Sequence, residues 1–427
     1  MARSSRVDAD HQTAALNELA QVSDARRIII ARGLRSFAYG MLAVVLGVWL
    51  AREGFSPVTI GALVTISLLG DFAGTYLIGL RADSWGRRRT LAALALLMGL
   101  TGLAVGFLTS YPALALVAFV GTLGASASET APFLPIEQAI LPQISAPAQR
   151  TRVFARYNFV ASLAGALGAL AAGLPDLLAR AGAPLLLGFR ALFVIYALAA
   201  LTVLALALSL SPAVEPESRP ARAECTRARF LPRLPQSSGV VYRLAGLFSL
   251  DALAGGLIVQ SLLALYFHQR FGASLGALAA LFFGANLLSA LSFLAAPMLA
   301  RRFGLLNTMV FTHLPSSLLL ALIPLAPTFP IAATLLLARQ MLSQMDVPTR
   351  QAYTMELVAP EERAAAASVT SLARSAGSAT SPVLSGLLLQ GPLLALGLPL
   401  ALAGGVKAGY DLALWRLFRH VPLRSSS

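Results

Sequence analysis

Cysteine and histidine are both scarce in this sequence. The only cysteine among 427 residues is Cys225, which excludes an intramolecular disulfide and any metal site built from several cysteines. The four histidines are spread along the chain: His11, His268, His313 and His420. Because metal-binding histidines normally occur at short, fixed spacings, the sequence predicts neither a metal site nor a cofactor held by one.

Lysine is also nearly absent, since Lys407 is the only one. A P-loop needs a lysine followed by serine or threonine, and Lys407 is followed by Ala408. The sequence therefore excludes ATP hydrolysis through a Walker A motif, and no nucleotide partner is expected.

Charged residues make up only 12% of the chain, about half of the roughly 25% typical of soluble domains. Hydrophobic residues make up 57%, and the mean hydropathy is +0.73. This apolar content is enough for about twelve membrane-spanning helices of about 20 residues each. The composition argues against a water-soluble enzyme and predicts an all-α integral membrane protein in contact with the lipid bilayer.

The apolar runs predict twelve transmembrane helices in two six-helix bundles. The first run is too long for the core of a signal peptide, so we interpret it as an uncleaved span. The predicted spans lie near 28–51, 58–80, 90–109, 113–134, 152–174, 186–209, 242–267, 275–299, 307–327, 329–352, 366–390 and 394–415. The predicted segments are an N-terminal segment (1–27), a first bundle (28–210), a proline-rich linker (211–241), a second bundle (242–415) and a tail (416–427).

Arginines between the spans predict the orientation. If the N-terminus is cytoplasmic, most loop arginines lie on the inner side, and only Arg52, Arg180, Arg190 and Arg270 lie outside. The positive-inside rule then places both termini in the cytoplasm, with the chain in the inner or plasma membrane. The net charge of +14 is divided among these loops and forms no continuous basic face, so nucleic acid is not an expected partner.

The two halves of the chain repeat each other. Residues 135–139 (PIEQA) match residues 348–352 (PTRQA) at an offset of 213, and the same offset relates Arg150 to Arg363. Chance similarity between alanine- and leucine-rich segments is the alternative explanation. A parallel repeat of six spans favours a transporter whose substrate site forms near the midplane, between the halves.

The loop between the second and third spans carries a recognisable motif, GLRADSWGRRR at residues 79–89. It resembles the G-x-x-x-D-[RK]-x-G-R-[RK] signature of the major facilitator superfamily, as does the twelve-span layout. The matching positions are Gly79, Asp83, Gly86, Arg87 and Arg88, whereas Ser84 replaces the expected basic residue. The resemblance implies a cytoplasmic gate centred on the aspartate, and we expect that aspartate at a helix start, where the macrodipole favours a negative charge.

Six ionisable residues fall inside predicted spans, where a charge needs a partner or a water-filled cavity. They are Asp71, Glu129, Asp251, Arg339, Asp346 and Arg374. Arg339, Ser343, Asp346 and Arg350 share one helical stripe. The resemblance implies that spans one, four, seven and ten line the central cavity.

These positions make Glu129 and Asp346 candidate proton carriers, and Arg339 and Arg374 candidate anchors for an anionic substrate. The alternative is that these residues form structural ion pairs. Asp71 and Asp251 are weaker candidates, because neither has a polar neighbour four or seven residues along its own helix. Arg32 and Arg35 are expected to extend toward the lipid headgroups.

Together these features predict a secondary transporter, not an enzyme, that moves a small organic molecule by alternating access. Proton-coupled export is the favoured interpretation. The superfamily's R-x-x-x-G pattern, which is associated with proton transfer, and the G-P-x-x-G-G element of many drug antiporters are absent, which weighs against proton-coupled drug efflux. The alternatives are proton-driven uptake of an organic anion and, less favoured, a membrane-embedded lipid-modifying enzyme.

Overall fold

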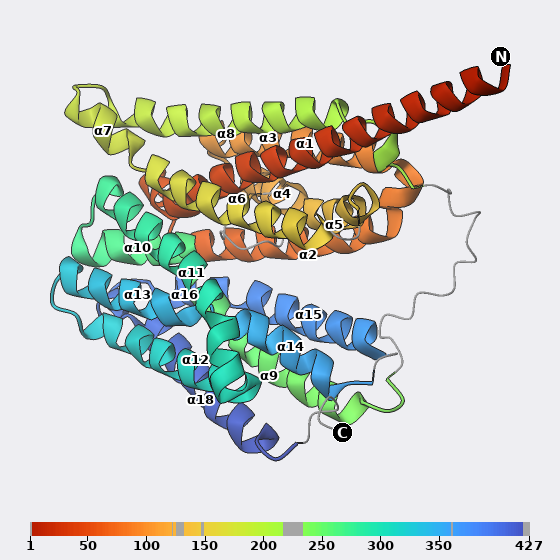
Figure 1. Cartoon of the computed structure of the whole chain (residues 1–427). Coiled ribbons are helices and arrows are strands. Elements are labelled where there is room, and N and C mark those ends of the chain that lie inside the picture. Colours follow the sequence, from red (N-terminus) through yellow and green to blue (C-terminus); the bar gives the residue numbers. More distant parts are fainter. Residues whose placement is uncertain are drawn as a thin grey trace.

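The computed structural model describes residues 2–121, 123–124, 132–146, 149–216, 234–359 and 362–421, with side chains from residue 21 onward except those of residues 151 and 364. Within these ranges the chain is helical and contains no strand. The first half (Figure 1) comprises α1 (Ala2–Arg52), α2 (Pro57–Trp85), α3 (Arg87–Phe107), α4 (Tyr111–Val120), α5 (Phe133–Gln143), α6 (Arg150–Ala171), α7 (Leu174–Arg180) and α8 (Leu185–Leu208). The all-α prediction is confirmed.

The second half repeats this arrangement. It comprises α9 (Ser238–Leu257), α10 (Gln260–Phe271), α11 (Leu275–Phe303), α12 (Leu305–Leu322), α13 (Phe329–Ser343), α14 (Asp346–Leu357), α15 (Arg363–Thr380), α16 (Pro382–Leu388), α17 (Leu393–Leu396) and α18 (Leu398–Phe418). In the first half α1 packs along α6 and α3 along α8; in the second half α9 packs along α15 and α12 along α18. Because α6 and α15, and likewise α8 and α18, begin 213 residues apart, the packing follows the repeat seen in the sequence.

Nine helices in the described part of the chain are long and apolar enough to cross a membrane. The other predicted spans correspond to interrupted helices: α4 and α5 in the first half, α13 and α14 in the second, and α15 followed by α16. The number twelve therefore stays a prediction. The first helix also differs from expectation, since α1 begins at Ala2 and the apolar part that can span a membrane starts at Gln21, before the predicted boundary at Ile28.

The helices present large apolar side chains outward. On α8, Phe189, Phe193 and Tyr196 are buried, whereas Leu187 and Leu198 on the opposite face are exposed. An apolar outer surface of this kind is unfavourable in water and favourable in lipid. The chain is a multi-pass membrane protein.

Two glycines make equivalent turns in the two halves. Gly86 joins α2 to α3 with φ +95°, and Gly304 joins α11 to α12 with φ +81°. Both angles lie in the region that only glycine adopts easily. We call the end of the molecule that carries these two turns the motif end, and the opposite end the distal end.

In the described part of the chain, the close contacts between the two halves lie at the distal end. Gly47 on α1 packs against Ser261 on α10, and a side chain at Gly61 on α2 would overlap the backbone of Pro382. The Val383 amide donates to Thr65 Oγ1 (3.1 Å), and the Gly276 amide donates to Asp176 Oδ2 (2.7 Å). Figure 1 shows the ribbons of the two halves close together around α10, α11 and α16, on the side away from the motif end.

Candidate functional site

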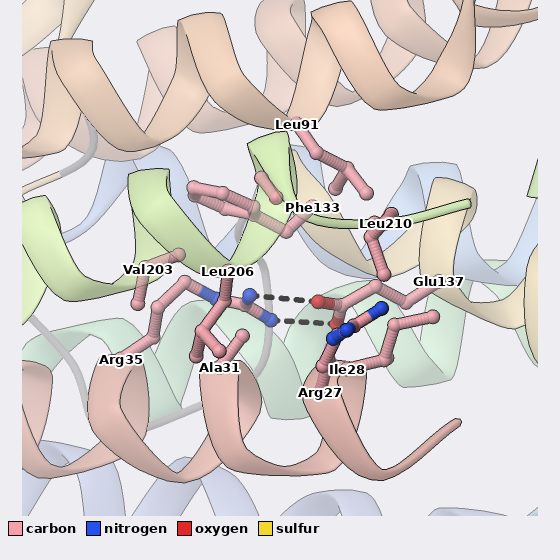
Figure 2. Close-up of a pocket in the computed structure, with 11 residues that line it drawn as sticks. Arg27, Ile28, Ala31, Arg35, Leu91, Phe133, Glu137, Val203, Leu206 and Leu210 are labelled. Carbon is pink, nitrogen blue, oxygen red and sulfur yellow. Dashed lines mark hydrogen bonds and ion pairs between the residues drawn. The ribbon is translucent and has the colours of Figure 1, made fainter. Parts of the chain in front are cut away.

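The first half encloses a buried ion pair between α1 and α5. The two terminal nitrogens of Arg35 donate to the two carboxylate oxygens of Glu137, at 2.7 and 2.6 Å (Figure 2). The Tyr157 hydroxyl on α6 donates to the same carboxylate at 2.6 Å, and the Arg35 guanidinium lies 4.1 Å from the centroid of the Phe133 ring. Both ionised groups are about 1% exposed, so the pair is bidentate, shielded from lipid and held by three helices.

The prediction that Arg32 and Arg35 extend to the headgroups is wrong. Arg32 is 3% exposed, and its guanidinium lies 5.1 Å from the centroid of the Tyr157 ring. Arg35 is turned into the bundle by Glu137, which lies 102 residues farther along the chain. A small pocket beside the pair, lined by residues of α1, α3, α5 and α8, extends along α1 toward Arg27 (Figure 2).

The second half has a larger charged cluster centred on Asp251 of α9. Lys407 Nζ on α18 lies 2.5 Å from Asp251 Oδ1. Arg374 on α15 and Arg350 on α14 approach the other carboxylate oxygen at 3.2 and 3.3 Å. Asp251 is 4% exposed, so one buried carboxylate balances cations from three other helices. Sequence reasoning ranked Asp251 low because it considered only neighbours on the same helix.

His313 on α12 extends this cluster. Its Nδ1 lies 2.9 Å from Asp411 Oδ1 on α18, and its Nε2 lies 3.9 Å from Asp251 Oδ1. All three side chains are buried. His313, which looked isolated in the sequence, thus bridges two carboxylates.

The polar stripe of the tenth predicted span lies at the edge of the same cluster. Asp346 accepts a hydrogen bond from Arg350 at 2.7 Å. Arg339 is 8% exposed and donates to Gln340 Oε1 at 2.9 Å, and that oxygen also accepts from Ser343. Arg339 is within electrostatic range of Asp251 and Asp346, but no carboxylate in the described residues forms an ion pair with it.

The two clusters are related by the repeat, with their charges exchanged. In the first half the first span supplies the cation, Arg35, and the fourth supplies the anion, Glu137. In the second half the seventh span supplies the anion, Asp251, and the tenth supplies the cation, Arg350. Glu137 and Arg350 occupy equivalent positions in the matching segments, 213 residues apart. That opposite charge at equivalent positions was the signal in the sequence that could have indicated both pairs.

Two candidates from the sequence stand outside these clusters. Asp71 on α2 is buried, and its Oδ1 has no hydrogen-bond partner in the described part of the chain. Glu129 lies outside the described residues. Of the six predicted ionisable positions, the structure therefore gathers four in the second half: Asp251, Arg339, Asp346 and Arg374.

The motif loop is held by contacts within its own half. Asp83 lies in the last turn of α2, not at a helix start as expected, and accepts from Arg87 Nε at 2.7 Å. The carboxylate at the start of α3 is that of Glu215, which accepts from the backbone amides of Arg87 and Arg88 at 2.8 and 3.1 Å. Gly79 has open space where a side chain would lie, so this structure gives it no packing role.

The segment that follows α8 lies across the motif end. The Gln143 amide on α5 donates to the carbonyl oxygens of Ala213 and Glu215, at 2.9 and 2.8 Å. Asp24 on α1 accepts from the amide and hydroxyl of Ser211. The start of the predicted linker is therefore tied to α1, α3 and α5. Residues 217–233, which make up most of that linker, and 422–427 of the tail lie outside the described residues.

The two carboxylates that contact the motif loop, Asp83 within it and Glu215 after α8, should differ in their effects. Glu215→Gln is expected to lower the free energy of unfolding by about 1 kcal/mol, because it removes a charged cap from a helix N-terminus. Asp83→Ala should change stability by less than about 1 kcal/mol, since its side chain is 52% exposed, yet lower transport turnover if the loop is a gate. Thermal unfolding in detergent and counterflow rates, with exposed Glu53→Gln as the control, measure the two effects. Undiminished transport by the Asp83 variant would contradict the gate.

Comparison with known proteins agrees with this architecture. Residues 28–382 match the sequence profile of the Major Facilitator Superfamily. The chain belongs to this superfamily. The chain is therefore a membrane transporter.

Known proteins resemble this chain in sequence or in structure. An uncharacterized membrane protein of Saccharomyces cerevisiae, YJR124C, is 27% identical over 382 residues, covering 83% of this chain and 85% of the yeast protein. A mutant of the nucleoside transporter NupG superposes with a TM-score of 0.75 at 17% identity, covering 92% of this chain and 100% of that one.

Two further solved structures are similar. A D-xylose–proton symporter has a TM-score of 0.72 at 16% identity, covering 94% of this chain and 99% of its own. A bacterial homolog of the human lysosomal transporter Spinster, in an inward-facing and unoccupied conformation, has a TM-score of 0.69 at 14% identity, covering 94% and 98%. At these identities the likeness concerns the fold.

Proposed function

We propose that this protein is a proton-coupled secondary transporter that exports a small organic anion by alternating access. In this proposal the motif end faces the cytoplasm, both termini are cytoplasmic, and the chain lies in the inner or plasma membrane. The contacts between the halves at the distal end then correspond to an inward-facing state. The fold similarity to an inward-facing Spinster homolog is consistent with that orientation.

The second-half cluster contains one more cationic side chain than carboxylates, which supports an anionic substrate. The second-half cluster contains four cationic side chains, Arg339, Arg350, Arg374 and Lys407, and three carboxylates, Asp251, Asp346 and Asp411. All are buried except Arg374, whose side chain is 34% exposed. A buried cation without a compensating charge is costly in a membrane. A substrate carboxylate, phosphate or sulfonate would supply the missing negative charge.

Arg339 is the residue that best fits this role, and it carries the proposal. It is buried, makes one hydrogen bond to an amide oxygen, and its Nε has no partner among the described residues. A guanidinium has five N–H donors in a planar arrangement that matches a carboxylate or phosphate. Most of its hydrogen-bonding capacity is therefore left for a ligand.

Proton coupling and export are proposed on different grounds. The spans contain buried carboxyl groups that a proton can bind, and the fold is similar to that of a D-xylose–proton symporter. Export is favoured over uptake by analogy with the superfamily alone. In proteoliposomes, the direction of the pH gradient that accelerates anion transport distinguishes the two. Acceleration by protons that move opposite to the anion indicates export by exchange, and acceleration by protons that move with the anion indicates uptake.

A thermal-shift screen tests the anion proposal. Wild-type protein in detergent is heated with carboxylates, organophosphates and sulfonates, each beside its neutral ester or amide. An anion at a hundred times its Kd should stabilise the folded state by about 2.7 kcal/mol, whereas its neutral analogue should not. In Arg339→Gln the affinity should fall roughly 10- to 100-fold, since hydrogen bonds to charged groups contribute about 1.5–3 kcal/mol.

The control is Arg302→Gln, which removes an exposed arginine at the motif end of α11. This variant should keep the wild-type response to the same anions. Stabilisation by neutral analogues as strong as by anions, or an unchanged response in Arg339→Gln, would overturn the proposal.

A further inference from the structure

Asp71 differs from the other buried acids of the spans. It lies near the middle of α2, is 5% exposed, and its Oδ1 accepts no hydrogen bond within the described part of the chain. Glu137 faces Arg35, Asp346 faces Arg350, and Asp251 faces Lys407 and two arginines. In the described residues Asp71 has no cationic partner.

The surroundings of Asp71 are polar but uncharged. Ser67 lies one turn earlier on α2, is fully buried, and its hydroxyl also has no described hydrogen-bond partner. Tyr196 on α8 is within electrostatic range of both Asp71 and Tyr39 on α1. The two tyrosine rings lie 6.3 Å apart, between centroids. Asp71 thus has the hydroxyl-bearing side chains Ser67 and Tyr196 in its surroundings, and Tyr39 packs beside Tyr196.

In the described part of the chain, no charged group of the neighbouring helices forms an ion pair with Asp71. Helices α4 and α16, which pack along α2, contain no charged residue. On the other helices in contact with α2, the charged residues past residue 21 are Asp24, Arg26, Arg27, Arg32, Arg35 and Arg52 of α1, Arg87, Arg88 and Arg89 of α3, Glu137 of α5, and Arg363 and Arg374 of α15. The arginines of α3 lie in its first turn, at the motif end, and Arg374 is paired with Asp251.

An ionised carboxylate in this position costs several kcal/mol, because no cation offsets its removal from water. Uptake of a cation removes that cost. A proton needs only one carboxylate oxygen, whereas a metal ion needs several ligands, and no group of acids and histidines suited to a metal occurs in the described residues. We infer that Asp71 binds the coupled proton, in a site completed by Ser67, Tyr39 and Tyr196.

This inference rests on the proposed proton-coupled function and adds the site of the proton. The position of α2 explains how that proton would act on the cycle. Toward the distal end Thr65 bonds to Val383 of the other half, and at the motif end α2 leads into the Gly86 turn. A change of charge at Asp71 thus occurs on a helix that joins the contact between the halves to the motif loop.

The first test detects the proton itself and needs no substrate. Infrared difference spectra of the full-length protein, recorded between acidic and alkaline pH, should contain the carbonyl band of a buried protonated carboxyl group. The band should vanish in Asp71→Asn, shift in Asp71→Glu and Ser67→Ala, and stay unchanged in Glu53→Gln, an exposed acid. A band unaltered by all three site variants would overturn the inference, and the glutamate and alanine variants decide it if the asparagine variant does not fold.

The second test uses the anion identified in the thermal-shift screen and proteoliposomes loaded with a pH-sensitive dye. In wild type, addition of the anion should move protons across the membrane, and in Asp71→Asn this movement should fall to that of protein-free liposomes while downhill counterflow persists. Proton movement retained in Asp71→Asn would overturn the inference and leave the proposed function standing. Absence of proton movement in wild type would overturn proton coupling itself.

Sodium is the competing cation, and a third comparison addresses it. Thermal stability in sodium chloride should equal that in choline chloride at the same ionic strength, for wild type and Asp71→Asn alike. Stabilisation by sodium that is lost in Asp71→Asn would assign the site to a metal ion and overturn the proton assignment.

Discussion

Asp251→Asn is expected to leave little or no folded protein in the membrane. The Asp251 carboxylate lies 2.5 Å from Lys407, 3.2 Å from Arg374 and 3.3 Å from Arg350, and all but Arg374 are nearly fully buried. Removing one partner of a buried ion pair costs about 3–5 kcal/mol, because the remaining charge has neither water nor a counter-ion. A loss of this size is a large part of the total stability of a typical protein.

Removing the opposing charge should restore part of this loss. We expect Lys407→Met alone to be destabilising, and Asp251→Asn combined with Lys407→Met to be more stable than Asp251→Asn alone. The measurement is the yield of monodisperse protein in detergent and its thermal unfolding midpoint. A fully stable Asp251→Asn variant, or no coupling in the double variant, would show that the second-half cluster does not depend on this charge balance.

Arg35→Met should have a similarly large effect in the first half. Glu137 would keep the Tyr157 hydroxyl as a partner but lose both hydrogen bonds from the guanidinium. A carboxylate left in this position without a cation should lower the free energy of unfolding by about 3–5 kcal/mol. Methionine fills much of the volume of the arginine stem, so the cost comes mainly from charge.

The double variant Arg35→Met with Glu137→Met separates charge from packing. Replacing both members of a buried pair by apolar residues is often close to neutral, so its unfolding midpoint should approach that of wild type. Arg190→Met serves as the control, because Arg190 is exposed and lies 5.7 Å from the centroid of the Phe107 ring. A double variant as unstable as Arg35→Met would attribute the loss to packing and not to the unpaired carboxylate.

The charge exchange between the halves explains why these two predictions are alike in size. Each half buries one ion pair between its first and fourth spans, and each pair is also contacted by a residue from the fifth, namely Tyr157 or Arg374. The helices of each half pack in the same way. The repeat therefore preserves the location of a buried ion pair, but not which helix carries the positive charge and which the negative charge. The second half adds Lys407, His313 and Asp411, which makes it the more polar of the two.

Local pattern was enough to predict the features that depend on short segments. Apolar runs of about 20 residues predict helices in lipid because a backbone without water must satisfy its hydrogen bonds internally. The motif at residues 79–89 indicated the superfamily, since the geometry of a turn depends on nearby residues. The offset of 213 indicated the two halves, since the same order of helices is repeated along the sequence. Helix periodicity placed Arg339, Asp346 and Arg350 on one stripe. All three are buried, but the helix is interrupted after Ser343, so that Arg339 lies on α13 and the other two on α14.

The partner of each buried charge was decided only by tertiary structure. Arg35 meets Glu137 across 102 residues, Asp251 meets Lys407 across 156, and Glu215 caps α3 from 128 residues away. The sequence therefore led to the wrong prediction that the Arg35 side chain reaches the lipid headgroups and that Asp83 lies at a helix start. It also made Asp251 a weak candidate for a functional residue. Spacing along one helix identifies which residues share a face, but whether a charge on that face is paired depends on which other helix packs against it, and that is determined by the folded bundle as a whole.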